Sequence, residues 1–200
     1  MEIFNYHPAT GEFLGVGLAD DSPLDPENPI VPGYATPTAV PESVAGRVAV
    51  YRNENGGVPQ NWQDGAWTFV PDYRAVPLFR TADGSSFELG AEYGGLGDLP
   101  PFLTDEPRPS PAYDWIADEW VLNPAKETQL LTDAALVTRA NLLAEADALV
   151  APLMDGFVLG ELTEEDEARL KALSQYRKAL RAVTAQAGFP RTIDWPVKPA

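Results

Sequence analysis

The clearest structural signal in the sequence lies at residues 163–183, TEEDEARLKALSQYRKALRAV. Thr163 can cap a helix with its hydroxyl, and acidic residues fill the first turn, where carboxylates complement the helix dipole. Apolar residues then recur at three- and four-residue spacings and form one face. They are Leu173, Tyr176, Leu180 and Val183. Gly188 and Pro190 are expected to end this helix. The helix should pack against the rest of the protein through its apolar face.

A longer helix is expected before it, beginning after Asn123-Pro124. Asparagine suits the N-cap and proline suits the first helical position. An apolar stripe follows at helical spacing, and Pro152 and Gly156 are expected to end it. The stripe consists of Leu131, Ala135, Leu142, Ala146, Leu149 and Leu153, widened by Leu130, Val137 and Leu143. Two such helices should pack as an antiparallel hairpin, followed by an extended tail that Trp195 docks.

Outward from the helices, the composition changes near residue 120. Residues 1–120 carry 19 acidic and 5 basic side chains, with 15 of the 20 prolines and 13 of the 16 glycines. Residues 121–200 carry 11 acidic and 9 basic side chains. Because proline and glycine interrupt regular structure, the first region should consist of short strands and turns. We therefore predict an α+β protein with two domains: a β-rich, acidic region, 1–120, and a helical hairpin with an extended C-terminal tail, 121–200.

Short hairpins are expected throughout the first region. One pairs residues 3–6 with 12–15, and another pairs 77–80 with 86–89 around the turn at 82–85. A strand is expected at residues 47–51. The six prolines between residues 20 and 46, Pro26 among them, predict an extended, polyproline-like arm.

Two tryptophan pairs share one spacing in this region. Trp62 and Trp67 enclose Asp64-Gly65, and Trp115 and Trp120 are also five residues apart. Asp-Gly is typical of a tight hairpin turn, because glycine accepts a positive φ. Each pair therefore predicts a small hairpin that closes an aromatic cluster.

Net charge and cysteine content exclude several classes of protein. The formal charge is −16, which repels phosphate backbones and anionic lipid surfaces, so we expect no nucleic-acid and no membrane partner. There is no cysteine, so disulfides and thiolate metal sites are excluded. We find no secretory leader and no apolar run of the roughly 18 residues that a membrane span requires. These features predict a soluble protein.

Candidates for catalysis and metal binding are weak. His7 is the single histidine, and no serine lies in a Gly-x-Ser-x-Gly elbow. Glycines at 15–17 and 94–97 lack the context of a phosphate-binding loop. A carboxylate pair could cleave a glycoside, but with 30 acidic residues a chance pair is common. The acids in residues 20–27 lack the spacing of an EF-hand. We therefore expect no enzyme, no catalytic residue, no metal and no cofactor.

Exposed aromatic residues are the better candidates for binding. In a small β domain, large rings first serve the core, because little area is available to bury. They also anchor protein interfaces and stack on sugars. The candidates for partner binding are Trp62, Trp67, Tyr73, Trp115 and Trp120. A carbohydrate-binding module that uses the tryptophans is the alternative function left open.

Several stretches in order along the chain resemble the tail-fibre assembly proteins of Mu-like and lambda-like bacteriophages. The start, FNYHPATGEFLG at residues 4–15, is similar to theirs, as are DGAWTFVPDYR at 64–74 and TADG at 81–84. The terminal pattern of the family resembles YRKAL at 176–180 and IDWP at 193–196. Its residues, for which we expect a structural role, are Tyr176, Arg177, Leu180, Asp194, Trp195 and Pro196. The family often has tryptophan where this chain has Leu173 or Ser174.

The resemblance implies a fibre-specific assembly chaperone. Such proteins bind the receptor-binding, C-terminal tip of a trimeric tail-fibre protein and assist its folding and trimerisation. The resemblance places the protein in the host cytoplasm during phage or prophage assembly; some members leave afterwards, and others stay on the virion. It implies no cofactor and no catalytic residue.

Overall fold

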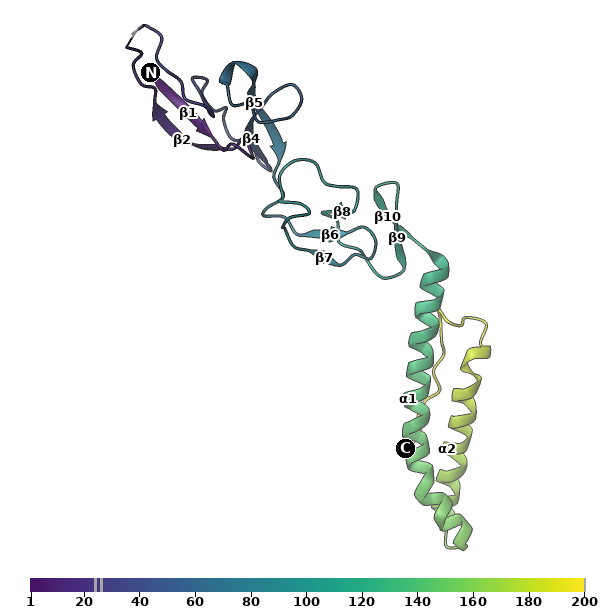
Figure 1. The fold of residues 1–200 in the computed structure, drawn as a ribbon. Helices are drawn as coiled ribbons and strands as arrows, with labels where there is room; N and C mark the ends of the chain where they lie inside the picture. Colours follow the sequence, from purple (N-terminus) through teal and green to yellow (C-terminus); the bar gives the residue numbers. More distant parts are fainter. Residues whose placement is uncertain (24, 26, 200) are drawn as a thin grey trace. The chain divides into compact units, whose positions relative to one another are not determined.

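The computed structural model describes residues 1–23, 25 and 27–199 (Figure 1). Internal contacts divide the chain into two compact units, Met1–Pro107 and Arg108–Ala200. The first unit contains short antiparallel strands, and the second contains one hairpin and two helices, so the α+β class is confirmed. The two domains that composition suggests, with a division at residue 120, remain a proposal.

The described residues of the first unit form eight short strands and one 3-10 turn. They are β1 (Glu2–Tyr6), β2 (Phe13–Leu18), β3 (Ala35–Thr36), β4 (Arg47–Arg52), η1 (Trp62–Asp64), β5 (Ala66–Pro71), β6 (Leu78–Arg80), β7 (Ser86–Phe87) and β8 (Leu103–Thr104). They form three antiparallel sheets, in the orders β2-β1-β3, β4-β5 and β7-β6-β8. The expected first hairpin, the strand at 47–51 and the hairpin around residues 82–85 are confirmed.

The proline-rich arm is more ordered than we expected. Ala35 and Thr36 pair with β1 and are both fully buried, so part of the arm completes the first sheet. The amide of Tyr6 donates to the carbonyl of Tyr34 at 2.8 Å. Prolines cannot donate to a ladder, but this short segment contains none, which leaves its backbone free to pair. Pro26, which the arm includes, lies outside the described residues.

The hairpin predicted around Asp64-Gly65 is wrong. Residues 62–64 form the 3-10 turn η1, and Gly65 has an extended backbone with φ −150°. The strand that follows, β5, pairs with β4 instead, so a longer loop joins the two strands. The physical reason lies in Tyr51, whose single O–H is shared between the carbonyls of Trp62 and Gly65, with oxygen–oxygen distances of 2.7 and 2.9 Å. These bonds hold the loop in a shape that its own residues do not encode.

The second unit begins with the predicted tryptophan hairpin. Strands β9 (Tyr113–Ile116) and β10 (Glu119–Leu122) pair antiparallel, and Trp115 lies directly opposite Trp120. The turn between them uses positive φ at Ala117 and Asp118, 51° and 63°, which are the left-handed conformations that a two-residue hairpin needs. The sequence predicted this hairpin from tryptophan spacing, with no glycine at the turn.

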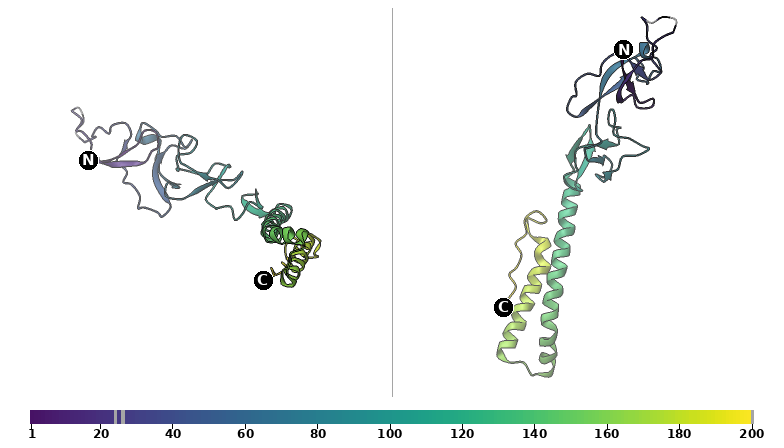
Figure 2. Two further views of the ribbon diagram at one scale, coloured as in Figure 1. Left: turned by 90° about the horizontal axis from the view of Figure 1, so that it is seen from below. Right: turned by 90° about the vertical axis from the view of Figure 1, so that its left-hand side faces the viewer.

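Two helices follow, α1 (Pro124–Leu159) and α2 (Glu164–Ala182), and a short 3-10 turn, η2 (Val183–Ala185). They lie side by side and antiparallel, so the helical hairpin is confirmed (Figure 2). The Asn123 side chain accepts the amides of Ala125 and Lys126, as expected of an N-cap. Thr163 caps α2 in the same way.

Two details of the helices differ from the prediction. Helix α1 continues through Pro152 and Gly156 and ends only before Gly160, which has φ 71°. Proline removes one hydrogen-bond donor, and the buried Val150 beside it keeps the helix packed. Leu130 and Val137 were expected to widen the buried stripe, and both are exposed, because α1 is covered along one side only. Helix α2 ends at Ala182, before the expected Gly188 and Pro190.

Each unit has its own apolar core. In the first unit, one cluster holds Ile3, Ala19 and Ala35, and another holds Leu78, Tyr93 and Leu103. In the second unit, the core lies between the helices. It consists of Ala146, Tyr176 and Leu180, with Leu142, Leu143 and Trp195 packed against it.

Candidate functional site

A cluster of aromatic rings surrounds Trp67 in the first unit. Tyr6 and Tyr51 stack with ring centroids 4.5 Å apart, and Trp67 meets Tyr51 edge-on at 5.1 Å. Phe13 and Tyr6 add further edge contacts with the indole at 6.4 and 6.1 Å. The Trp67 Nε1–H donates to the carbonyl of Thr38 at 2.9 Å. Packed rings of this kind contribute mainly to stability, so Trp67 offers a partner only its remaining exposed surface.

Hydrogen bonds of the buried tyrosines connect this cluster to the backbone. The Tyr6 hydroxyl donates to the carbonyl of Pro59 at 3.0 Å, and the hydroxyl of Thr36 donates to the Tyr51 oxygen at 3.3 Å. Burial, followed by the nearby Tyr51, Tyr34 and Asp64, raises the pKa of Tyr6 to about 12. Tyr6 therefore stays neutral at physiological pH and acts as a structural donor.

Trp62 occupies a more open place. It is half-buried and lines an open hollow of about 490 Å³, formed by η1 and the proline-rich arm. The lining includes Pro29, Pro32, Pro37, Gln60, Asn61 and Gln63. Prolines and one indole beside amide side chains can accept an apolar side chain with a polar neighbour. Trp62 is thus the candidate whose surroundings best fit a binding role.

Tyr73 belongs to a different cluster. It packs against the core that Leu78, Tyr93 and Leu103 form. Beside it, Arg74 donates to Asp72 and to Glu12, through distances of 2.7 and 2.8 Å. The hydrogen bond from Arg74 lowers the pKa of Asp72, and these two carboxylates raise the pKa of Arg74. This part of the site is a structural clamp that ties Glu12, the residue before β2, to the chain after β5.

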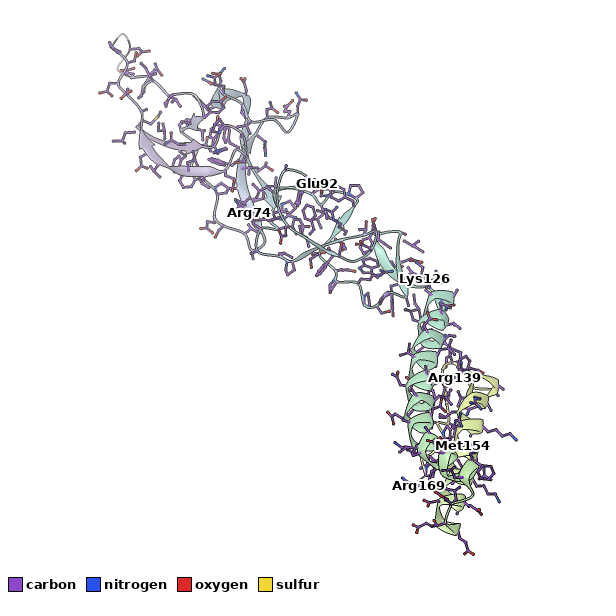
Figure 3. The ribbon with its side chains drawn as sticks, turned by 60° about the horizontal axis from the view of Figure 1, so that its bottom comes forward. Arg74, Glu92, Lys126, Arg139, Met154 and Arg169 are labelled. Atoms are coloured by element: carbon purple, nitrogen blue, oxygen red, sulfur yellow. The ribbon has the colours of Figure 1, made fainter. Side chains whose placement is uncertain are left out.

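Trp115 and Trp120 are brought together in the second unit. Their ring centroids lie 5.1 Å apart at an interplanar angle of 73°, and the Arg108 guanidinium lies 5.4 Å from the Trp120 centroid. Asp114 accepts from Lys126, at the start of α1 (Figure 3), and from Asn123. These bonds, that of Lys126 first, lower the pKa of Asp114. The hairpin is therefore fixed against the helix start with both indoles half-exposed.

The residues of the terminal pattern lie in or beside the helical core. Tyr176 and Leu180 are buried, and Trp195 packs against them. Arg177 Nε lies 2.6 Å from Asp147 Oδ1, an ion pair between the two helices. The backbone of Asp194 exchanges two hydrogen bonds with the side chain of Gln186, at 2.9 and 2.8 Å. Pro196, which follows Trp195, is half-buried.

The three aromatic candidates of the first unit do not form one site. Trp67 is part of the tyrosine cluster, Trp62 lines the hollow, and Tyr73 packs in the next sheet of the first unit. Trp115 and Trp120 form a pair in the second unit. Each of these rings is held by its own local packing.

Two exposed apolar surfaces escaped the sequence interpretation. On β2, the side chains of Leu14, Val16 and Leu18 are 63, 58 and 76% exposed. At the end of α1, Phe157, Val158 and Leu159 are also exposed, beside the exposed Met154 labelled in Figure 3. The alternation of apolar residues with glycine along β2 was visible in the sequence. The sequence alone did not show that one edge of this strand is left unpaired.

His7, the single histidine, has a structural role. The Nδ1 atom of His7 accepts the amides of Ala9 and Thr10, so this histidine stabilises a turn. Among the described residues, no group of three or more histidine, aspartate or glutamate side chains is placed to hold a metal ion. No helix in the described part of the chain is long and apolar enough to span a membrane.

Known proteins match the chain along its whole length. Residues 104–200, which contain the hairpin and both helices, match the family described as Caudovirales tail fibre assembly protein, lambda gpK. The chain is similar to phage tail fibre assembly proteins over its whole length. This confirms the relationship that the sequence motifs indicated.

Three relatives span nearly all of both chains. The prophage tail fiber assembly protein homolog TfaR of Escherichia coli K12 is 28% identical over 199 residues, which cover 100% of this chain and 94% of the relative. The tail fiber assembly protein of Escherichia phage lambda is 27% identical, with 100 and 93% covered. The prophage homolog TfaE of Escherichia coli K12 is 26% identical, with 100 and 90% covered. No solved structure matches the chain.

Proposed function

We propose that this protein is an assembly chaperone for a phage tail-fibre protein. It binds the C-terminal, receptor-binding tip of the fibre and promotes its folding and trimerisation. The observation that supports this most strongly is the match of the entire chain to proteins named for tail fibre assembly. A role in assembly follows from the relatives; the fibre tip as its target is our proposal.

The physics of fibre assembly explains why such a protein is needed. A trimeric tip must bring strands from three chains together, and non-local pairing of this kind is slow. Meanwhile, the unassembled chains expose apolar surface and unpaired strand edges, which aggregate. A protein that covers these surfaces reversibly raises the yield of correct trimers. The exposed apolar residues on β2 and at the end of α1 are of the kind that such binding requires.

The aromatic residues remain candidates for contact with the fibre. They are Trp62, Trp67, Tyr73, Trp115 and Trp120. Trp62 is supported by its place in the hollow beside the proline-rich arm, and the Trp115–Trp120 pair by its half-exposed indoles. Tyr73 and Trp67 pack against other residues of the first unit, which leaves less of their rings for a partner. We propose that the arm and these rings grip the fibre together, with protein recognition in place of sugar binding.

The same proposal covers the surroundings of the protein. It acts in the host cytoplasm, as a binding protein without cofactor or catalysis, and without nucleic-acid or membrane partners. The charge of −16 supports the absence of nucleic acid from its partners, because phosphate would be repelled. Retention on the finished virion is a separate question, which mass spectrometry of purified particles answers.

Co-expression tests the proposal. The C-terminal fragment of a candidate tail-fibre protein is produced with and without this chain, and soluble trimer is measured by gel filtration. We expect soluble trimer to depend on this chain; equal yields would contradict the proposal. Trp62→Ala should lower the yield, whereas Val197→Ala, at a residue 90% exposed on the tail, should not. Binding to a glycan array tests the alternative that the protein is a carbohydrate-binding module.

A further inference from the structure

One edge of β2 has backbone groups that point away from the sheet. The amide of Ala19 donates to the carbonyl of Met1 at 3.0 Å, and Gly17 and Gly15 lie opposite Ile3 and Asn5. Because antiparallel ladders alternate, Gly15, Gly17 and Ala19 direct their N–H and C=O groups toward β1. Val16 and Leu18 therefore direct theirs outward. Figure 1 shows β2 at the outside of the β1–β2 pair.

This open edge is bounded at both ends. Before β2, Glu12 is bridged to Val50 of β4. After it, the carbonyl of Asp20 accepts the amide of Ile30 at 2.8 Å. Between these two points lie residues 14–18. This length suits a short incoming strand, which would extend the β2-β1-β3 sheet by one member.

The side chains of this segment are suited to pairing. Leu14, Val16 and Leu18 are all exposed and alternate with Gly15 and Gly17. The ideal Cβ position at Gly15 has open space around it. An incoming chain thus meets apolar groups at every second position and small residues between them.

Most of the usual protection of an edge strand is missing here. Natural proteins blunt such edges with lysine, proline, bulges or covering segments, because exposed edges recruit other strands. Residues 14–18 contain no charge and no proline, and the single irregularity of the β1–β2 register falls at the start, at Leu14. An edge left open beside three exposed apolar side chains indicates a binding surface.

The acidic charge of the first unit indicates what kind of segment would bind at this edge. Within Met1–Pro107 there are 16 acidic side chains, 4 arginines and no lysine. The exposed Glu2 lies opposite Leu18, and the exposed Asp20 and Asp21 follow the strand. A segment that pairs here is therefore favoured when lysine or arginine flanks its apolar residues. A second copy of this chain would bring the same carboxylates together, which disfavours edge-to-edge dimers.

We propose that the outward edge of β2, residues 14–18, binds an extended segment of the fibre chain as an added antiparallel or parallel strand. The segment carries apolar residues at alternate positions and a basic residue beside them. This inference rests on the proposed function and names one surface through which it operates. While the segment is held, its own strand edge is withheld from wrong partners until the trimer forms.

Hydrogen exchange at single amides tests the proposal directly. In the free protein, the amides of Val16 and Leu18 should exchange fast and that of Gly17 slowly. On addition of the C-terminal fibre fragment, the Val16 and Leu18 amides should slow by about tenfold or more, as ladder amides do. Unchanged exchange in a complex that does form would overturn the proposal. Protection in the absence of the fibre that rises with protein concentration would point to a second copy and would also overturn it.

Two substitutions at one residue separate backbone pairing from apolar contact. Val16→Pro removes an outward N–H and leaves the ladder to β1 intact, whereas Val16→Thr keeps the donor and the branched shape. We expect the Kd for the fibre fragment to rise by about tenfold or more for Val16→Pro and to change little for Val16→Thr. If Val16→Pro lowers the melting temperature, Leu18→Lys at the exposed neighbouring position replaces it.

The two proposals fail in different ways. If wild-type protein neither binds the fragment nor raises trimer yield, the proposed function is wrong. If wild-type protein does both while Val16→Pro and Leu18→Lys match it, the edge of β2 is not the surface and the function stands.

Discussion

Trp115 and Trp120 lie directly opposite each other on β9 and β10, with ring centroids 5.1 Å apart and an edge-to-face arrangement. This contact closes a hairpin of only four residues a strand, which would be marginal without it. Arg108 lies over the Trp120 ring, and Asp114 is bonded to the start of α1. The pair therefore holds the entry to the helical hairpin.

A double-mutant cycle measures that contact. Trp115→Ala and Trp120→Ala should each destabilise the second unit, and the double variant should lose less than the sum of the two. The expected coupling is about 0.5–1.5 kcal/mol, the usual range for an edge-to-face aromatic pair. Urea unfolding followed by tryptophan fluorescence and circular dichroism provides the free energies. Additive losses would show that the rings contribute independently.

Removal of the Tyr51 hydroxyl should be costly. In Tyr51→Phe, the part-buried carbonyls of Trp62 and Gly65 lose the hydroxyl donor that they share, and the buried Thr36 hydroxyl loses its acceptor. We expect a loss of about 1–3 kcal/mol in the free energy of unfolding. Tyr6→Phe is the matched control, because it removes a single bond, that to Pro59, and should cost less. A smaller loss for Tyr51→Phe than for Tyr6→Phe would contradict the account of the loop.

Replacement of Trp195 should lower the stability of the protein and not act on fibre binding alone. Its indole packs on the core of Ala146, Tyr176 and Leu180, so Trp195→Ala should lower the free energy of unfolding by about 3 kcal/mol. Val197→Ala, on the same tail and 90% exposed, should change it by less than about 0.5 kcal/mol. Thermal melts of the two variants provide the comparison. Loss of fibre binding by Trp195→Ala with an unchanged melting temperature would overturn the structural assignment.

The Arg74 clamp predicts a pH dependence. The hydrogen bond from Arg74 lowers the pKa of Asp72 in the folded protein, so the pair stabilises the fold above the unfolded pKa of about 3.9 and less as pH falls through the folded pKa. Arg74→Gln should therefore cost up to about 1 kcal/mol at pH 7, since the arginine is partly exposed, and less below roughly pH 4. Urea unfolding of the wild type and of Arg74→Gln at pH 7 and below roughly pH 4 measures this cost. An equal cost at both would exclude this origin.

Local signals were sufficient to predict much of the fold. Asn123-Pro124 and Thr163 marked the helix starts, and the spacing of Trp115 and Trp120 predicted their hairpin. Each of these features depends on residues within a few positions of one another. The apolar face of α2 likewise follows from its period.

The errors arose where distant residues decide the structure. The loop around Asp64-Gly65 is held by Tyr51, and the strand at Ala35 exists because β1 lies beside it. Helix α1 continues past Pro152, although local propensity predicts an end there. Sequence alone could name aromatic candidates for binding, but it could not show which rings pack away or that one edge of β2 is open.

The central claim is that this chain helps fibre chains to fold and trimerise. Refolding measures it most directly: the C-terminal fibre fragment is diluted from denaturant with and without an equimolar amount of this protein, and trimer is quantified over time. We predict a higher final yield of trimer and less aggregate in its presence, with Val16→Pro intermediate or inactive. Identical yields and identical aggregation with and without the protein would contradict the claim.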